Sequence, residues 1–237
     1  MTDGAKGELA VYAGVPLKLI QFIPLSEDAD DLVYDSATKL LYVGYGGTNS
    51  ANPSRVAVVD TTSLHLISNL SVASHPEELE LDPTADRIFV NVADSGQVVV
   101  IDGKTHQIAA TWSLHHGKDN TPLAFDAADG LLLVGCRTPA EVLVVNGTSG
   151  IEGATMKSET GADDLFFEPA TRHAFLVTGA GTVDAFAVSA DGLLSRLAAT
   201  QTERGAKTGY LDPKHRRLFI GVPGTSGPSS VRVYATN

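Results

Sequence analysis

The chain has 237 residues, and its 17 Lys and Arg residues against 28 Asp and Glu residues give a formal net charge of −11. This surplus of acid disfavours binding to nucleic acid or to an anionic membrane surface, because both depend on clustered cations. The single cysteine, Cys136, excludes an intramolecular disulfide and a zinc site built from several cysteines. With 43% hydrophobic residues, the chain is expected to be globular.

A short apolar segment that ends in an acidic residue recurs along the chain. The acidic residues, called the markers here, are spaced by 47, 44, 42 and 44 residues and are Asp35, Asp82, Asp126, Glu168 and Asp212. Each marker precedes a polar turn and further short segments rich in Val, Ile, Phe and Tyr, which is typical of β-strands. No stretch of twelve or more residues shows a helical period.

Four short antiparallel strands repeated about every 40–45 residues predict the blades of a β-propeller. We predict an all-β chain of about five blades in one domain spanning 1–237. The predicted repeat units are about 26–73, 74–117, 118–160, 161–204 and 205–237.

The two ends of the chain decide how the predicted propeller closes. The last unit stops at its third strand, so residues 17–25 are predicted to supply the fourth strand and close the ring. The earlier segment Glu8–Tyr12 also has the pattern of a strand and would be surplus in a ring of five blades. It is interpreted as the remnant of a preceding blade, so a shortened form of a larger propeller remains the alternative.

Several short motifs resemble the YVTN-repeat β-propeller family (YncE-like). They are Tyr42–Gly46, Val56–Asp60, His75–Glu77, Arg87–Asn91, Gly135–Arg137, Asp163–Phe166 and Val231–Tyr234. The resemblance runs from about Leu17 to Tyr234 and implies a propeller, commonly of seven blades, in a family mostly without assigned activity. It also implies a periplasmic or secreted protein, whereas the first residues of this chain show no secretory h-region. The family supplies no catalytic residues.

Paired carboxylates precede the markers in three of the predicted blades. In a propeller these positions lie at the mouth of the central channel, where ligands bind. Close like charges should raise some of their pKa values, and carboxylate and amide oxygens suit Ca²⁺ or Mg²⁺. We therefore predict a divalent-cation site, most simply for Ca²⁺, of Asp31, Glu78, Asn120 and Asp164. The alternative interpretation is that these acidic residues only form solvated turns.

Other polar residues at the predicted mouth are candidates for catalysis or ligand binding. Glu77 or His116 would be the general base, and Arg137 would steady an anionic group or neutralise a neighbouring carboxylate. Cys136 with His116 as its base is a further nucleophile candidate, but a lone Cys after an apolar strand is more often a buried hydrophobe. The predicted ligand contacts are Tyr45, His75, Asn91, His115 and Lys207.

The absence of a strong catalytic motif favours a propeller that binds a small molecule, a peptide or a protein and has no assigned activity. The alternative is a metal-dependent hydrolase of the lactonase, esterase or phosphotriesterase type, which rests on analogy with other propellers. Whether the chain is an enzyme stays open at this point. A third interpretation is a shortened chain that forms homo-oligomers through exposed blade edges or strand exchange.

Overall fold

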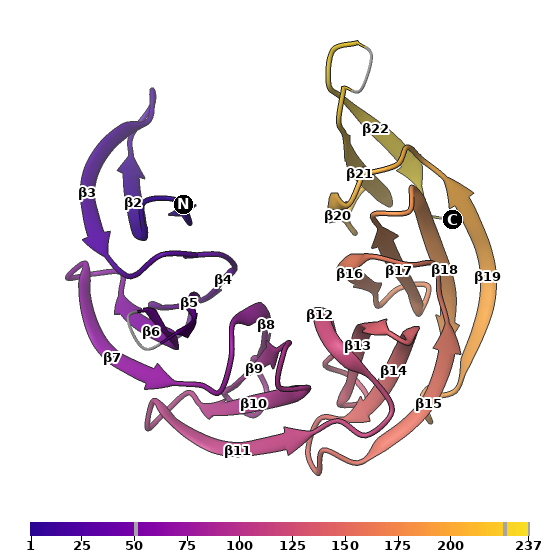
Figure 1. Ribbon diagram of the computed structural model, residues 1–237, viewed down its shortest axis with the longest axis horizontal. Helices are drawn as coiled ribbons and strands as arrows, with labels where there is room; N and C mark the ends of the chain where they lie inside the picture. Colours follow the sequence, from indigo (N-terminus) through magenta and orange to yellow (C-terminus); the bar gives the residue numbers. More distant parts are fainter. Residues whose placement is uncertain (50–51, 225–226, 237) are drawn as a thin grey trace. The chain divides into compact units, whose positions relative to one another are not determined.

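The computed structural model describes residues 1–49, 52–224 and 227–236, in which 22 strands form six antiparallel sheets (Figure 1). The strands divide between two compact units, Met1–Ser113 and Leu114–Asn237, which are described separately. Within the described residues, no helix is long and apolar enough to cross a membrane.

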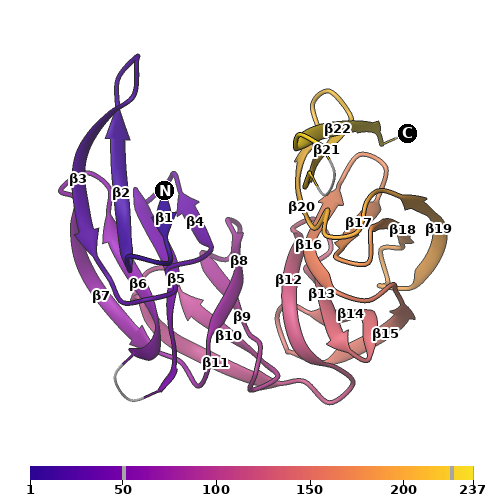
Figure 2. The ribbon, with the colours of Figure 1, turned by 45° about the horizontal axis from the view of Figure 1, so that its top comes forward.

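The first unit contains three sheets, each formed by strands that are consecutive in the chain (Figure 2). The first sheet is β1 (Thr2–Asp3), β2 (Glu8–Ala13) and β3 (Lys18–Pro24). The second sheet is β4 (Leu32–Asp35), β5 (Leu40–Asn49), β6 (Asn52–Asp60) and β7 (His65–Ser71). The third sheet is β8 (Pro76–Asp82), β9 (Arg87–Val92), β10 (Gln97–Asp102) and β11 (Gln107–Ser113).

The second unit also contains three sheets of consecutive strands. Its first sheet is β12 (Lys118–Asp126), β13 (Leu131–Thr138), β14 (Ala140–Asn146) and β15 (Glu152–Lys157). Its second sheet is β16 (Ala162–Glu168), β17 (His173–Thr178), β18 (Thr182–Val188) and β19 (Leu194–Gln201). Its third sheet is β20 (Thr208–Asp212), β21 (Arg217–Val222) and β22 (Ser230–Ala235).

Neighbouring sheets within each unit pack face to face through buried side chains. In the first unit, Tyr42 of the second sheet shares a core cluster with Ile88 of the third. In the second unit, Leu133 of its first sheet shares a cluster with Leu176 of its second. Because the middle strands are covered on both faces, they are continuous apolar runs rather than alternating ones. The outermost strands of the four-stranded sheets are mostly exposed.

The fold is an all-β propeller of antiparallel blades, as predicted, but the described residues form six blades rather than about five. Four of these blades are four-stranded, and the first and last are three-stranded. The predicted closure by residues 17–25 is wrong. β3 pairs with β2, in a register that sets Leu9 opposite Ile23, and β22 pairs only with β21 among the described strands. A hairpin between consecutive strands closes a short loop, which costs less entropy than pairing the two chain ends. The segment Glu8–Tyr12 therefore belongs to an additional blade, as its interpretation as a remnant proposed.

The marker residues owe their recurrence to turn geometry. Three of them accept the amide of the second following residue at 2.8–3.1 Å, namely Asp35, Asp82 and Asp126. The residue four positions after every marker has a positive φ, and these residues are Lys39, Asp86, Gly130, Arg172 and Arg216. The hairpin that joins the first two strands thus keeps a left-handed residue at the same position in all five marked blades. In three of them a side-chain oxygen of the marker also fixes the turn.

Candidate functional site

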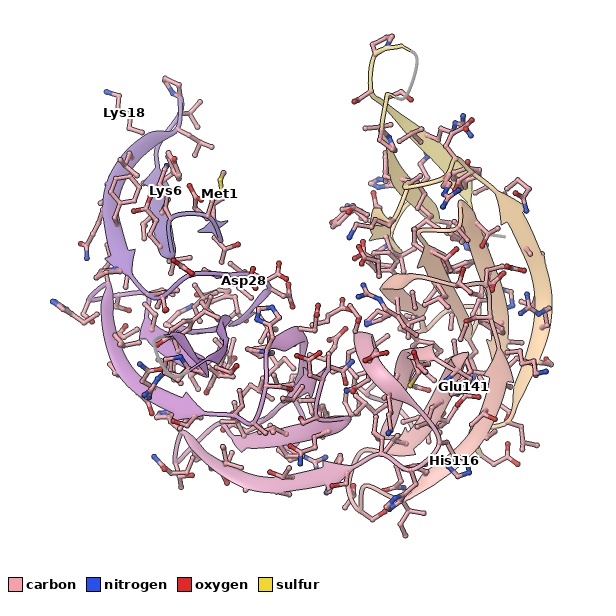
Figure 3. The ribbon with its side chains drawn as sticks, viewed as in Figure 1. Met1, Lys6, Lys18, Asp28, His116 and Glu141 are labelled. Carbon is pink, nitrogen blue, oxygen red and sulfur yellow. The ribbon has the colours of Figure 1, made fainter. Side chains whose placement is uncertain are left out.

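The first unit gathers charged residues around one histidine, His75, which stands just before β8. Its Nδ1 donates to the Gly46 carbonyl at 2.7 Å and lies 3.6 Å from Asp28 Oδ2. Its Nε2 lies 3.8 Å from Asp30 Oδ2. Asp28 and Asp30 come from the segment that enters β4, and Figure 3 labels Asp28 there. With Glu77 of β8, these residues are called the His75 cluster: Asp28, Asp30, His75 and Glu77.

The surroundings of His75 favour its charged form. Asp30, whose Oδ2 lies 3.8 Å from Nε2, is the largest cause that raises the pKa of His75 to about 9. The Gly46 carbonyl and the charges of Asp28 and Glu77 add to the shift, and burial opposes it. At neutral pH the ring is therefore an imidazolium. The side chain of His75 is only 15% exposed, whereas those of Asp28 and Asp30 are 66% and 59% exposed. The cluster consequently presents carboxylates to solvent around a half-buried cation.

Three members of the cluster could also hold a metal ion. One ligand atom each from Asp30, His75 and Glu77 lie within 4.8 Å of one another. Because Nδ1 donates to the Gly46 carbonyl, the ring would offer Nε2 as its ligand atom, an arrangement common among metal-binding histidines. A nitrogen and two carboxylates suit zinc or another transition metal better than Ca²⁺, which prefers oxygen ligands alone. The proton on Nε2 would have to leave first.

Two of the four predicted metal ligands instead connect neighbouring blades. Asp31 Oδ2 accepts the amide of Leu79 at 2.8 Å, and Asp164 Oδ2 accepts the amide of Gly209 at 2.6 Å. Both aspartates stand four residues before a marker, and both amides stand three residues before the marker of the next blade. The repeat therefore uses this carboxylate as a link between sheets.

The other two predicted metal ligands lie apart in the chain, Glu78 half-buried on β8 and Asn120 fully buried on β12. The predicted set is thus divided between the two units, with Asp31 and Glu78 in the first and Asn120 and Asp164 in the second. A cation held by these four residues together stays a prediction.

Asp31 has a raised pKa, as expected for some of these carboxyl groups, but the largest cause is burial and not the neighbouring charge. Burial raises its pKa, and the charge of Asp30 adds to the shift, while the amides of Leu79 and Leu32 oppose it. Sequence reasoning missed Glu80, two residues before the marker Asp82. Burial and the charge of Asp31 raise the pKa of Glu80 to about 8. The available signal was an acid in the middle of a first strand, where the other blades have Val33, Ala124, Phe166 and Tyr210.

In the second unit, Arg137 and Lys207 share one carboxylate. Arg137 donates through Nε to the Ala162 carbonyl at 2.8 Å and through Nη2 to Asp163 Oδ1 at 2.6 Å. Lys207 Nζ lies 3.0 Å from Asp163 Oδ2. Of the two interpretations of Arg137, the structure shows the neutralisation of a neighbouring carboxylate, which is Asp163. Both cations remain partly exposed, with 36% and 55% of their side chains accessible.

His115 and His116 lie close to Cys136, but the surroundings of His116 and Cys136 do not suit a general base and its nucleophile. The ring Nδ1 of His116 pairs with Glu152, and the amides of His115 and His116 donate to the same carboxylate at 2.6 and 3.2 Å. Cys136 is fully buried, and burial, with the charges of Glu141, Glu152 and Asp119, raises the pKa of its thiol to about 12. The interpretation of Cys136 as a buried hydrophobe is confirmed.

The remaining predicted contacts lie inside the fold. Tyr45 is buried and donates from its hydroxyl to Asn69 Oδ1 at 2.9 Å, and Asn91 is fully buried on β9. Two surface hollows of about 680 and 420 Å³ lie elsewhere and contain none of the predicted site residues. The larger is lined by residues that include Lys39, Lys104 and His106, and the smaller by residues that include Arg204.

Comparison with known proteins identifies relatives of the fold. No protein-family model matches the chain, and no curated protein matches it in sequence. A functionally unknown protein from Desulfotomaculum acetoxidans DSM 771 is similar in structure with a TM-score of 0.76 and 12% identity, over 100% of this chain and 85% of the other. A chain of the mitotic checkpoint complex is similar with a TM-score of 0.78 and 15% identity, over 91% of this chain and 65% of the other. At such identities the likeness shows the fold alone.

Removal of the link between blades should destabilise the second unit. We expect Asp164→Ala to lower the free energy of unfolding by about 1–3 kcal/mol, because the partly buried amide of Gly209 loses its acceptor. Asp164→Asn should lose less, since its amide oxygen can still accept. Urea denaturation followed by circular dichroism measures both, with Glu159→Gln on the exposed surface as the control. Equal stabilities of the alanine variant and the unsubstituted protein would refute the structural role.

The His75 cluster should make stability depend on pH in one direction. The folded-state pKa of about 9 lies above the ordinary 6.5, so the stabilisation is complete below about pH 6.5 and is lost as the pH rises through 9. We expect the difference in unfolding free energy between the unsubstituted protein and His75→Asn to shrink by about 1–3 kcal/mol over that range. An NMR titration of the ring checks the pKa directly, and a midpoint near 6.5 would contradict the assignment.

Proposed function

We propose that this chain is a ligand-binding propeller of the YVTN-repeat type, without chemistry of its own, and that its binding site is the His75 cluster. The propeller fold supports a role as a binding scaffold, because strand ends and loops from several blades share one face of a propeller. The observation that carries the proposal is the exposure of Asp28 and Asp30, at 66% and 59%, beside a histidine that is already protonated.

The net negative charge of the His75 cluster indicates that its ligand carries positive charge. Three carboxylates surround one imidazolium, so the cluster keeps a surplus of negative charge that attracts a cationic group. The ligand we propose carries an ammonium or guanidinium group, as a lysine- or arginine-containing peptide does. The net charge of −11 strengthens this attraction at low ionic strength.

A specific observation keeps the hydrolase as the second candidate. The ligand atoms of Asp30, His75 and Glu77, within 4.8 Å of one another, would hold a divalent transition metal that polarises a carbonyl or phosphoryl oxygen. In that case Glu77 is a metal ligand and not the general base. The cationic candidates Arg137 and Lys207 belong to the second unit and already bind Asp163.

Binding of a cationic peptide tests the first proposal. We expect acetylated tetralysine to bind in calorimetry at low salt, and the double variant Asp28→Asn/Asp30→Asn to bind it about tenfold or more weakly. Asp94→Asn is the matched control, since Asp94 is an exposed aspartate of the same unit outside the cluster. Equal weakening by the control variant, or no binding at all, would refute the proposed site.

Turnover with and without a chelator decides between the two functions. We expect no hydrolysis of activated esters, lactones or phosphotriesters by the protein supplied with Zn²⁺ or Ca²⁺. Hydrolysis that disappears both with EDTA and in His75→Asn would instead establish the metal-dependent hydrolase. The folded state of the variant is confirmed by circular dichroism.

A further inference from the structure

One carboxylate holds the segment Leu114–Gly117, called the strap here, which begins the second unit. The two oxygens of Glu152 accept the amides of His115 and His116 at 2.6 and 3.2 Å, and the ring of His116 pairs with the same group. The side chain of Glu152 is only 8% exposed. Glu152 therefore receives three hydrogen bonds from two successive residues of the strap, and charged acceptors make such bonds strong.

The strap covers two buried groups of the sheet beneath it. A Cβ atom at Gly117 would lie 2.3 Å from Cys136 Sγ and 3.7 Å from Glu141 Oε1, so only glycine allows this close approach. Leu114 and Gly117 are buried, whereas both histidines are exposed. The backbone of the strap thus lies directly on the Cys136 thiol with the Glu141 carboxyl beside it.

The second covered group is the carboxyl of Glu141, one oxygen of which lacks the hydrogen bonds that Glu152 receives. Glu141 is 8% exposed, and its Oε1 has no hydrogen-bond partner among the described residues. Glu152 and His116 are the charged groups that act on it, and Cys136 and Lys157 lie opposite it on the neighbouring strands. Asp119 of β12 acts on the thiol. Figure 3 labels Glu141 on β14 and His116 in the strap.

These two environments shift the pKa values of Glu141 and Glu152 in opposite directions. Burial raises the pKa of Glu141, partly offset by the charge of His116 and reinforced by that of Glu152. Burial alone would raise the pKa of Glu152 as well, but the hydrogen bonds from the His116 ring and the two strap amides hold it below its ordinary value. Glu141 therefore keeps its proton to a higher pH than Glu152 does.

We propose that the strap is a pH-sensitive cover over Cys136, closed while Glu141 is protonated and loosened when Glu141 ionises. An ionised Glu141 is a buried charge with an unpartnered oxygen beside a second carboxylate, which is unfavourable unless water enters. Water reaches Oε1 when the Gly117 backbone moves away. The same movement uncovers the thiol, so the reactivity of Cys136 follows the state of the strap.

Hydrogen exchange of the His115 and His116 amides, measured by NMR from pH 4.5 to 9 and corrected for intrinsic exchange, tests the proposal. We expect protection to fall as the pH rises through the raised pKa of Glu141. Glu141→Gln should stay protected throughout, because its side chain cannot ionise. Glu159→Gln, an exposed acid of the same unit, should reproduce the unsubstituted profile. An identical fall in Glu141→Gln would overturn the proposal.

A thiol reagent supplies the second measurement. At one fixed pH near 6, we expect Glu152→Gln to raise the labelling rate of Cys136 by about tenfold or more, because the strap loses charged hydrogen bonds. Amide protection of Leu176 in β17 separates this local opening from global unfolding of the unit. An unchanged labelling rate in Glu152→Gln, with Leu176 still protected, would refute the strap as the cover of Cys136.

Discussion

The structure depends on the packing of sheet against sheet. A four-stranded sheet with Val, Leu and Ile on both faces must be covered on both sides, and within each unit the adjacent sheets do this for one another. Asp31 and Asp164 fix the position of one blade on the next, since each accepts an amide from the first strand that follows. Buried amides need acceptors, so these two carboxylates are occupied by structural hydrogen bonds and are less available for catalysis or metal binding. The acidic character of the repeat is thereby partly structural.

The all-β class and the blade pattern could be predicted because they depend on local chemistry. Three of the markers accept an amide two residues later, and a positive φ four residues after every marker completes the turn. The number of blades could not be predicted from the sequence in the same way. Glu8–Tyr12 and residues 17–25 have strand patterns that fit two different pairings, and the short connection between them, not composition, favours the hairpin.

The candidate site was less predictable, because the role of a carboxylate depends on contacts between segments far apart in the chain. Asp30 and Asp31 are neighbours in sequence, yet one faces His75 and solvent while the other accepts the Leu79 amide. Glu152 lies 36 and 37 residues from the two histidines that it binds, so no local motif predicts that contact. His75 and Glu77 were predicted as site residues, but their association with Asp28 required the packing of two blades.

In the part of the chain that the structure describes, every hydrogen-bonded strand pair joins consecutive strands, which has a consequence for how the protein is made. A blade needs no strand from a distant part of the sequence, so its hairpins can form while later residues are still being synthesised. Within each unit, a completed sheet then offers an apolar face on which the next sheet of that unit can assemble. Each unit can therefore fold by successive addition of its sheets, with the newest sheet as the surface most exposed to misassociation until its neighbour in the unit forms.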